Sequence, residues 1–252
     1  MINARGAPGP GSPWSSGRDE VSTRAAVRSM FASVAHRYDF LNHFLSLGSD
    51  IAWRRATARA LRDALTRPGS RVADLCCGTG DLSFCLGRLS QGVVMGADFC
   101  HPMLAIARGK AGGRAPRVHF LEADVLHLPF GDASLDAVTS AFGFRNLANY
   151  DRGIEEMRRV LKPAGRLAIL EFSRVRWPFF GPLFRFYFHR VLPRVGTWIS
   201  GVEGPYRYLP DSVAQFPEQD ALADKLREAG FHNVGYVNLT GGVAALHVGE
   251  KG

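Results

Sequence analysis

A short strand-like segment that ends in a glycine turn carries the residue types of a cofactor cleft. Residues 72–75 (Val-Ala-Asp-Leu) predict a buried strand, which breaks into the turn 76–80 (Cys-Cys-Gly-Thr-Gly). Gly78 and Gly80 lack a Cβ, so the backbone can turn sharply and approach a ligand closely. Asp98 ends the next apolar run, where a carboxylate can accept hydrogen bonds from a ribose diol. The pattern therefore predicts an enzyme with a nucleotide-type cofactor.

The residues after the turn favour S-adenosylmethionine over a dinucleotide. A dinucleotide fingerprint has a third glycine beside the pyrophosphate, but Ser83 occupies that position. Asp81 stands at the predicted start of a helix, where its negative charge would repel a phosphate. A cationic cofactor without phosphate fits these residues better than NAD does. The turn alone also leaves open a strand-to-helix connection that binds nothing.

Composition and cysteine usage indicate the class of protein. The chain has 252 residues, of which 46% are hydrophobic, and this suits one α/β domain at residues 21–252. Its four cysteines include no CxxC pair, and they predict reduced, buried thiols and a cytoplasmic protein. They are Cys76, Cys77, Cys85 and Cys100. The histidines lack metal-ligand spacing, so no metal site is predicted.

The ends of the predicted domain differ in composition from its centre. Residues 1–20 are rich in Gly, Pro and Ser and predict a disordered leader. They contain no apolar core of a signal peptide, and no run of about eighteen apolar residues predicts a membrane span. Residues 174–210 form an aromatic and basic insertion within a chain of net charge +8. Such a mixture suits a lipid headgroup boundary, while a helical lid or a homodimer surface is the alternative.

Hydrophobic periodicity predicts an alternation of strands and helices behind two N-terminal helices. The N-terminal helices (within 21–66) are expected at 22–36 and 51–66. Further helices are expected at 81–89, 102–110, 149–161 and 219–229, and strands at 71–76, 92–98, 117–122, 135–141 and 165–172. The segments 234–239 and 243–248 read as an antiparallel hairpin across Thr240-Gly241-Gly242. The order predicts a parallel, doubly wound sheet that finishes in a hairpin.

Several motifs follow one another in an order that resembles one enzyme family. They are 35–42 (Ala-His-Arg-Tyr-Asp-Phe-Leu-Asn), 76–81, 140–147 (Ser-Ala-Phe-Gly-Phe-Arg-Asn-Leu), 158–166 (Arg-Arg-Val-Leu-Lys-Pro-Ala-Gly-Arg), 171–173, 206–209 with 216–217, and 238–247. Together they resemble the quinone-biosynthesis C-methyltransferases, the demethylmenaquinone and ubiquinone methyltransferase family. The resemblance spans about residues 24–250. It implies a class I, Rossmann-like methyltransferase fold with a seven-stranded, mostly parallel sheet.

The resemblance also implies where S-adenosylmethionine binds. Thr79, between Gly78 and Gly80, matches a position that contacts the cofactor, and Asp98 matches the ribose-binding acid. Asp124 and Val125 match the pair beside the adenine, where a carboxylate can accept from the exocyclic amine. Some relatives carry Ser at position 141. The hydroxyl of such a serine could contact the ligand, but Ala141 has no hydroxyl, so no such contact is expected in this protein.

The implied reaction is methylation of a ring carbon in a polyprenylated quinol. Loss of a hydroxyl proton gives a phenolate whose neighbouring carbon can attack the sulfonium methyl. Arg145 is expected to stabilise the phenolate or to hold a water, Asn146 to orient a quinol oxygen, and Tyr38 to close the pocket. Without the resemblance, the Arg-Asn pair reads as a helix cap and Tyr38 as a core aromatic.

Three other functions compete with this prediction, and the acceptor ring stays open. A nucleic-acid methyltransferase would explain the charge, but residues 140–143 (Ser-Ala-Phe-Gly) lack the motifs for amino-group or cytosine methylation. An NAD-linked oxidoreductase is disfavoured by Ser83 and by the hairpin. A non-enzymatic quinone-handling protein would not need the glycine turn and both acids.

Residues 76–77 and Phe99 look more like the menaquinone branch than the ubiquinone branch. The prediction is therefore a demethylmenaquinol methyltransferase, with a methoxy-benzoquinol acceptor as the alternative. Transient contact with the inner face of the cytoplasmic membrane and a homodimer are also expected.

Overall fold

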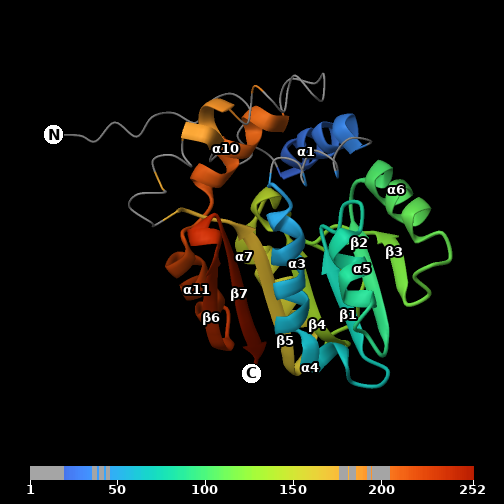
Figure 1. Cartoon of the computed structure of the whole chain (residues 1–252). Coiled ribbons are helices and arrows are strands. Elements are labelled where there is room, and N and C mark those ends of the chain that lie inside the picture. The colour runs from blue at the N-terminus through green and yellow to red at the C-terminus, as the bar shows by residue number, and fades with distance from the viewer. Residues whose placement is uncertain are drawn as a thin grey trace.

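A seven-stranded sheet lies at the centre of the molecule, with helices on both of its faces. The computed structural model describes residues 20–35, 39, 43, 46–175, 181, 186–191, 194 and 205–252. Two helices, α1 (Glu20–Val34) and α10 (Pro205–Gln215), lie beyond one end of the strands (Figure 1). The cleft described below opens at this end.

The strand order is β3-β2-β1-β4-β5-β7-β6, and the pairs among β1 to β5 are all parallel. β7 lies between β5 and β6 and is antiparallel to both. This confirms the predicted parallel sheet that ends in an antiparallel hairpin. The strands are β1 Arg71–Leu75, β2 Val93–Asp98, β3 Val118–Glu122, β4 Leu135–Ala141, β5 Leu161–Phe172, β6 Phe231–Leu239 and β7 Ala244–Lys251.

The helices fall close to their predicted positions, except α10, which the sequence analysis did not predict. They include α3 Ser49–Ala60, α4 Arg62–Leu65, α5 Asp81–Gly87, α6 His101–Ala111, α7 Tyr150–Val160 and α11 Gln219–Glu228, with short turns η2 Phe144–Asn146, η3 Tyr187–Val191 and η4 Thr240–Gly242. The single helix predicted for 51–66 is wrong in one respect. It is broken at Leu61, whose ψ of 6° interrupts the helical backbone while its side chain stays buried.

Two strands begin earlier than predicted because each contains an irregular segment. β5 starts at Leu161, where the sequence predicts a helix end, and its register against β4 shifts before Arg166. β6 starts at Phe231, and its register against β7 shifts between His232 and Gly235. Periodicity reveals a regular strand but not a bulge, so the extra residues escaped the prediction.

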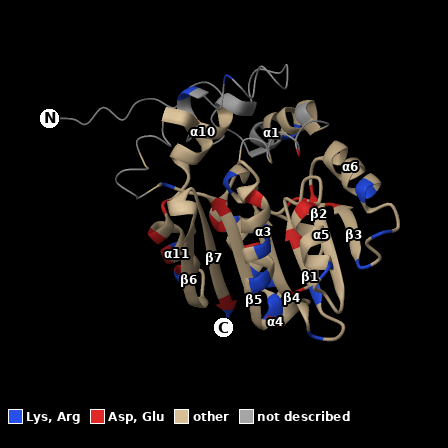
Figure 2. Ribbon diagram, viewed as in Figure 1, with Lys and Arg blue, Asp and Glu red and all other residues tan. Residues whose placement is uncertain are grey.

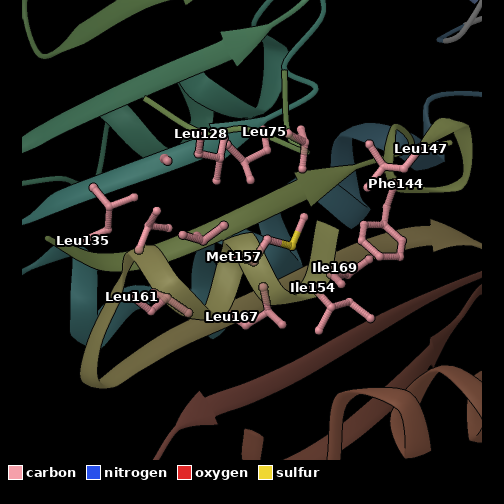
Figure 3. Packing of buried hydrophobic residues seen from close by; sticks show 14 of the residues in the cluster. Leu75, Leu128, Leu135, Phe144, Leu147, Ile154, Met157, Leu161, Leu167 and Ile169 are labelled. Atoms are coloured by element: carbon pink, nitrogen blue, oxygen red, sulfur yellow. The ribbon is translucent and has the colours of Figure 1, made fainter. Parts of the chain in front are cut away.

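The central strands β1 and β4 and the second half of β5 are buried on both faces of the sheet, whereas the edge strands β3 and β6 are partly exposed. Along β5, Leu167 and Ile169 pack into the cluster formed with α7 and α11. The alternate residues Ala168 and Leu170 pack into the cluster formed with α3, α4 and α5. Figure 3 shows the first cluster, in which Met157 of α7 lies among residues of the sheet. This two-sided packing fixes the strand ends that carry the site.

Local signals in the sequence account for α7. Asn149 is its N-cap, and the Asn149 side chain accepts a hydrogen bond of 3.0 Å from the Arg152 backbone N–H. Such a cap stabilises a helix by about 1 kcal/mol. Ile154, Met157 and Val160 follow at helical spacing and are buried. These buried residues pack α7 against the sheet, and α7 is the helix that follows β4 and η2 in the chain.

Several predictions from the sequence fall on residues that the structure does not describe. The predicted leader at 1–20 lies outside the described residues except for Glu20, and so does Tyr38. Within the insertion at 174–210, the structure describes residues 174–175, 181, 186–191, 194 and 205–210. None of the helices in the described part of the chain has the length and apolarity that crossing a membrane requires.

Candidate active site

The glycine turn follows β1 and needs its two glycines for different reasons. Gly78 and Gly80 both have positive φ, +54° and +86°. A Cβ on Gly80 would lie 2.7 Å from the Phe120 ring, so packing excludes a side chain there. A Cβ on Gly78 would meet no atom within 4 Å, because this residue borders the open cleft. Gly78 therefore leaves space for a ligand, and Gly80 allows the turn to pack.

Asp98, at the end of β2, holds the turn in place. Its Oδ2 accepts a hydrogen bond of 2.8 Å from the Gly78 N–H, and its Oδ1 accepts one of 2.8 Å from the Cys100 N–H. Burial raises the pKa of this carboxyl to about 6. Each carboxylate oxygen has a second lone pair, so Asp98 can still accept from a ribose diol at the cleft wall.

The cleft occupies about 720 Å³, including its open mouth, at the carboxyl ends of β1, β2 and β4. Its described lining comes from α1, α3, α5 and α6, from the ends of these strands and from the loops that follow them. The lining residues are Phe31, Arg54, Asp74, Cys76, Cys77, Gly78, Thr79, Asp81, Leu82, Asp98, Phe99, Cys100, Met103, Ala141, Phe142, Gly143, Asn146 and Leu147. The structure therefore brings five predicted site residues together: Gly78, Thr79, Asp98, Asn146 and, through the turn, Gly80.

Asp74 is a buried acid beneath the turn that the sequence prediction did not include. Its Oδ2 accepts a hydrogen bond of 2.6 Å from the Ser83 hydroxyl. Its Oδ1 is buried and has no hydrogen-bond partner among the described residues. Burial raises the pKa of Asp74 to about 7. An acid with an unused oxygen at the cleft wall suits a cationic ligand. Ser83, which replaces the dinucleotide glycine, is used to hold this acid.

Thr79 and Asp81 are bound to charged residues from the N-terminal segment and α6. The Thr79 hydroxyl donates to Asp39. Lys110 lies 3.0 Å from Asp39 and also pairs with Asp81. His43 lies 3.5 Å from Asp81. These contacts join the segment around residues 39–43 to the glycine turn. The sequence analysis placed residues 35–42 in a motif of the resembled family, but it did not identify these partners.

Asp124 and Val125, predicted beside the adenine, follow β3 and do not line the cleft. The Asp124 carboxylate accepts a hydrogen bond of 3.0 Å from the Leu126 N–H. The Val125 side chain is buried in the core with Leu75 and Ala97. Val125 can therefore reach a ligand only through its backbone.

Arg145 lies behind the cleft wall rather than on it. Its guanidinium is 2.7 Å from Glu171, and both side chains are almost fully buried. The Arg145 backbone N–H donates to the other Glu171 oxygen at 3.1 Å, and Nε donates to Ser212 at 3.3 Å. The guanidinium also lies 5.4 Å from the centre of the Phe172 ring. This geometry favours a positioning role, in which Arg145 fixes the η2 turn, over direct contact with an acceptor.

Asn146 is the η2 residue that reaches the cleft. Its Oδ1 accepts a hydrogen bond of 2.9 Å from the Tyr208 hydroxyl of α10. Burial raises the pKa of Tyr208 to about 12, so the phenol stays protonated and keeps donating at neutral pH. With Tyr208 donating to Oδ1, the amide nitrogen of Asn146 is the group that can donate to a ligand, and Oδ1 keeps one further lone pair.

The four cysteines are free thiols. Cys100 is buried, as predicted, but Cys76, Cys77 and Cys85 are only half-buried. Burial together with nearby carboxylates raises the pKa of the Cys76 and Cys77 thiols. No group of three or more metal-ligating side chains occurs among the residues that the structure describes. The polar side chains among the described cleft lining include its acids, Arg54, Thr79 and the amide of Asn146.

Comparison with known proteins places the chain among methyltransferases. The demethylmenaquinone methyltransferase of Thermus thermophilus is 52% identical over 223 residues, which make up 88% of this chain and 100% of that protein. The ubiquinone/menaquinone biosynthesis C-methyltransferase UbiE of Geobacter sulfurreducens is 41% identical over 230 residues, 90% of this chain and 88% of that protein.

The fold is also similar to that of a solved methyltransferase structure. A SAM dependent methyltransferase from Aquifex aeolicus aligns with a TM-score of 0.56 and 21% identity, over 77% of this chain and 88% of that chain. At this identity the likeness shows a shared fold. A model of the ubiE/COQ5 methyltransferase family matches residues 19–251. The chain belongs to the ubiE/COQ5 methyltransferase family.

Proposed function

We propose that this protein transfers a methyl group from S-adenosylmethionine to a ring carbon of demethylmenaquinol. The observation that carries the proposal is the 52% identity to the Thermus thermophilus demethylmenaquinone methyltransferase over the whole length of that protein. A methoxy-benzoquinol of ubiquinone biosynthesis is the alternative acceptor, because the Geobacter sulfurreducens relative is named for both pathways.

The cleft suits this cofactor in charge and in shape. S-adenosylmethionine, when bound, supplies an electrophilic methyl group on a sulfonium centre. Gly78 leaves the space that a ligand needs against the turn, and Asp98 offers lone pairs to a ribose diol. Asp74 and Asp98 give the cleft wall acidic groups, which suit a cationic cofactor. Thr79 lines the same wall, and Asp124 and Val125 remain proposed neighbours of the adenine.

The acceptor is proposed to bind at the β4 end, where Asn146 reaches the cleft. The amide nitrogen of Asn146 donates a hydrogen bond to a ring oxygen and thereby orients the ring. Arg145, paired with Glu171, holds the η2 turn that carries Asn146. Tyr38 is proposed to close the pocket, as the resemblance implies.

Methylation of a quinol, with the quinone as control, tests this proposal. Purified protein is incubated with methyl-labelled S-adenosylmethionine and reduced demethylmenaquinol, and the product is identified by mass spectrometry. Labelled menaquinol is expected from the quinol and none from the oxidised quinone, because only the quinol can form a nucleophilic phenolate. Turnover of a methoxy-benzoquinol alone would replace the acceptor by the alternative. Binding of the cofactor without turnover of either ring would overturn the proposal.

We also propose that the protein contacts the membrane surface reversibly to meet its polyprenylated acceptor. The described part of the 174–210 insertion exposes Phe186, at 61%, together with Arg190 and Arg194. Such a mixture of aromatic and basic side chains suits anionic headgroups. Sedimentation with phosphatidylglycerol vesicles should carry the protein down at low salt, and pure phosphatidylcholine vesicles should not. Equal absence from both pellets would contradict the proposal.

A further inference from the structure

Arg54, on α3, is the only cation among the described residues that line the cleft. The lining also includes three acids, Asp74, Asp81 and Asp98. S-adenosylmethionine carries a carboxylate on its methionine end, in addition to its ammonium and sulfonium groups. A carboxylate that entered a cleft with three acids would be repelled unless a cation lay beside it. The charge pattern of the cleft therefore draws attention to Arg54.

The guanidinium of Arg54 is held in position from several sides. Its Nη1 donates to the buried Asp50, and its Nη2 lies 4.0 Å from Asp81 Oδ2. The guanidinium carbon lies 5.8 Å from the centre of the Phe142 ring. Asp50 is itself fixed by hydrogen bonds of 2.7 Å to the Ser46 hydroxyl and to His43 Nδ1. The Arg54 side chain is 12% exposed, so it is ordered by packing yet still borders the cleft.

Most of the hydrogen-bonding capacity of Arg54 is unused. A guanidinium has five N–H donors. Among the described residues, the Arg54 guanidinium makes one hydrogen bond, to Asp50. The remaining donors form the planar fork that binds a carboxylate in a bidentate manner. Arg54 thus has the charge and the free donors that a carboxylate ligand needs.

We propose that Arg54 binds the methionine carboxylate of S-adenosylmethionine, with Asp50 and Phe142 as the residues that position its guanidinium. This inference rests on the proposed cofactor. The competing explanation is an (i, i+4) ion pair with Asp50 that only stabilises α3 itself. In that case Arg54 would not distinguish a cofactor with a carboxylate from one without it.

Isothermal titration calorimetry tests the inference by comparing the affinity for S-adenosylmethionine with the affinity for its decarboxylated analogue. The analogue lacks only the carboxylate. In Arg54→Leu, the affinity for S-adenosylmethionine is expected to fall about 10- to 100-fold, as for a lost hydrogen-bonded charge pair. The affinity for the analogue should stay unchanged or rise, because a cation has been removed.

Arg55→Leu is the matched control. It replaces the next residue of α3, an exposed arginine outside the cleft, and should change neither affinity. Figure 2 shows that α3 carries several basic positions.

A second variant keeps the test decisive if Arg54→Leu does not fold. Arg54→Lys retains the charge but not the fork, so it should bind S-adenosylmethionine with intermediate affinity and bind the analogue as the wild type does. Equal weakening of both ligands in either variant would overturn the inference and leave the cofactor in place. Failure of the wild-type protein to bind S-adenosylmethionine would overturn the proposed function and the inference with it.

Discussion

The two sides of the cleft are built in different ways. On the cofactor side, a turn and one acid meet through backbone groups, since Asp98 accepts from the N–H groups of Gly78 and Cys100. On the side proposed for the acceptor, Arg145 is held by Glu171 and by Ser212, which lies 67 positions away in the chain. Backbone contacts tolerate changes of side chain, whereas a buried side-chain network depends on each member. The cofactor side should therefore be sensitive to glycine conformation, and the acceptor side to charge.

The largest effect is expected on the acceptor side, from Glu171→Gln. This change removes the negative charge of Glu171 from beside the buried Arg145 guanidinium, and the loss of one member of a buried ion pair destabilises proteins by about 3–5 kcal/mol. Urea unfolding would measure the free energy of unfolding. Glu250→Gln is the control, since Glu250 pairs with Arg166 at 2.9 Å in a half-exposed position. It should cost less than about 1 kcal/mol. Similar losses in both variants would contradict the assignment of a buried pair.

On the cofactor side, Gly78→Ala should weaken the binding of S-adenosylmethionine. The new Cβ projects into open space at the cleft, and steric conflict of this kind costs about 1–3 kcal/mol, or about 5- to 150-fold in affinity. Gly69→Ala is the matched control, because Gly69 also has positive φ and open space but does not line the cleft. Both variants should lose similar stability from backbone strain, about 1–2 kcal/mol. Loss of affinity in both would show that strain alone is responsible.

The same contrast explains what the sequence could predict. The order of strands and helices and the final hairpin follow from periodicity. Gly78, Gly80 and Asp98 follow from spacing, because the turn and the acid lie on neighbouring strands, β1 and β2. The boundaries of β5 and β6 did not follow, because bulges leave no periodic signal.

Contacts between distant parts of the chain could not be predicted from one sequence. The pairing of Arg145 with Glu171 depends on the register of β4 against β5, and the bond from Tyr208 to Asn146 depends on where α10 packs. The resemblance assigned Arg145 a role at the acceptor. That role stays a prediction, and the structure adds a buried partner for the charge of Arg145, a feature that only tertiary packing determines.

The pH dependence of cofactor binding would sharpen the description of the cofactor side. Burial raises the folded-state pKa of Asp98 to about 6, above its ordinary 3.8, so its charged form costs stability above about pH 6 and this cost disappears as the pH falls toward 4. A cationic cofactor favours the charged form. Protonation of Asp98 should therefore lower the affinity for S-adenosylmethionine by up to about tenfold for each pH unit below 6. Calorimetry at a series of pH values checks this.

Two variants assign the transitions in that pH profile. Asp98→Asn should remove the transition near pH 6 and lower the affinity at high pH. Asp74→Asn should remove a second transition near pH 7, the pKa to which burial raises Asp74. An affinity in the wild type that does not change between about pH 5 and 8 would contradict the involvement of both acids.

The smallest effect tests whether the two sides act independently. Tyr208→Phe removes the hydrogen bond to Asn146 Oδ1 but keeps the packing of the ring, and a bond of this kind contributes about 0.5–1.5 kcal/mol. Freed from Tyr208, the amide can rotate, so turnover of the quinol should fall about 2- to 10-fold. Tyr236→Phe, which removes a hydroxyl bonded to Asp220 on the surface, is the control and should leave turnover unchanged. The affinity for S-adenosylmethionine should not change in either variant, because Tyr208 acts only through Asn146. If Tyr208→Phe weakened cofactor binding as much as turnover, the cleft would respond as a single unit.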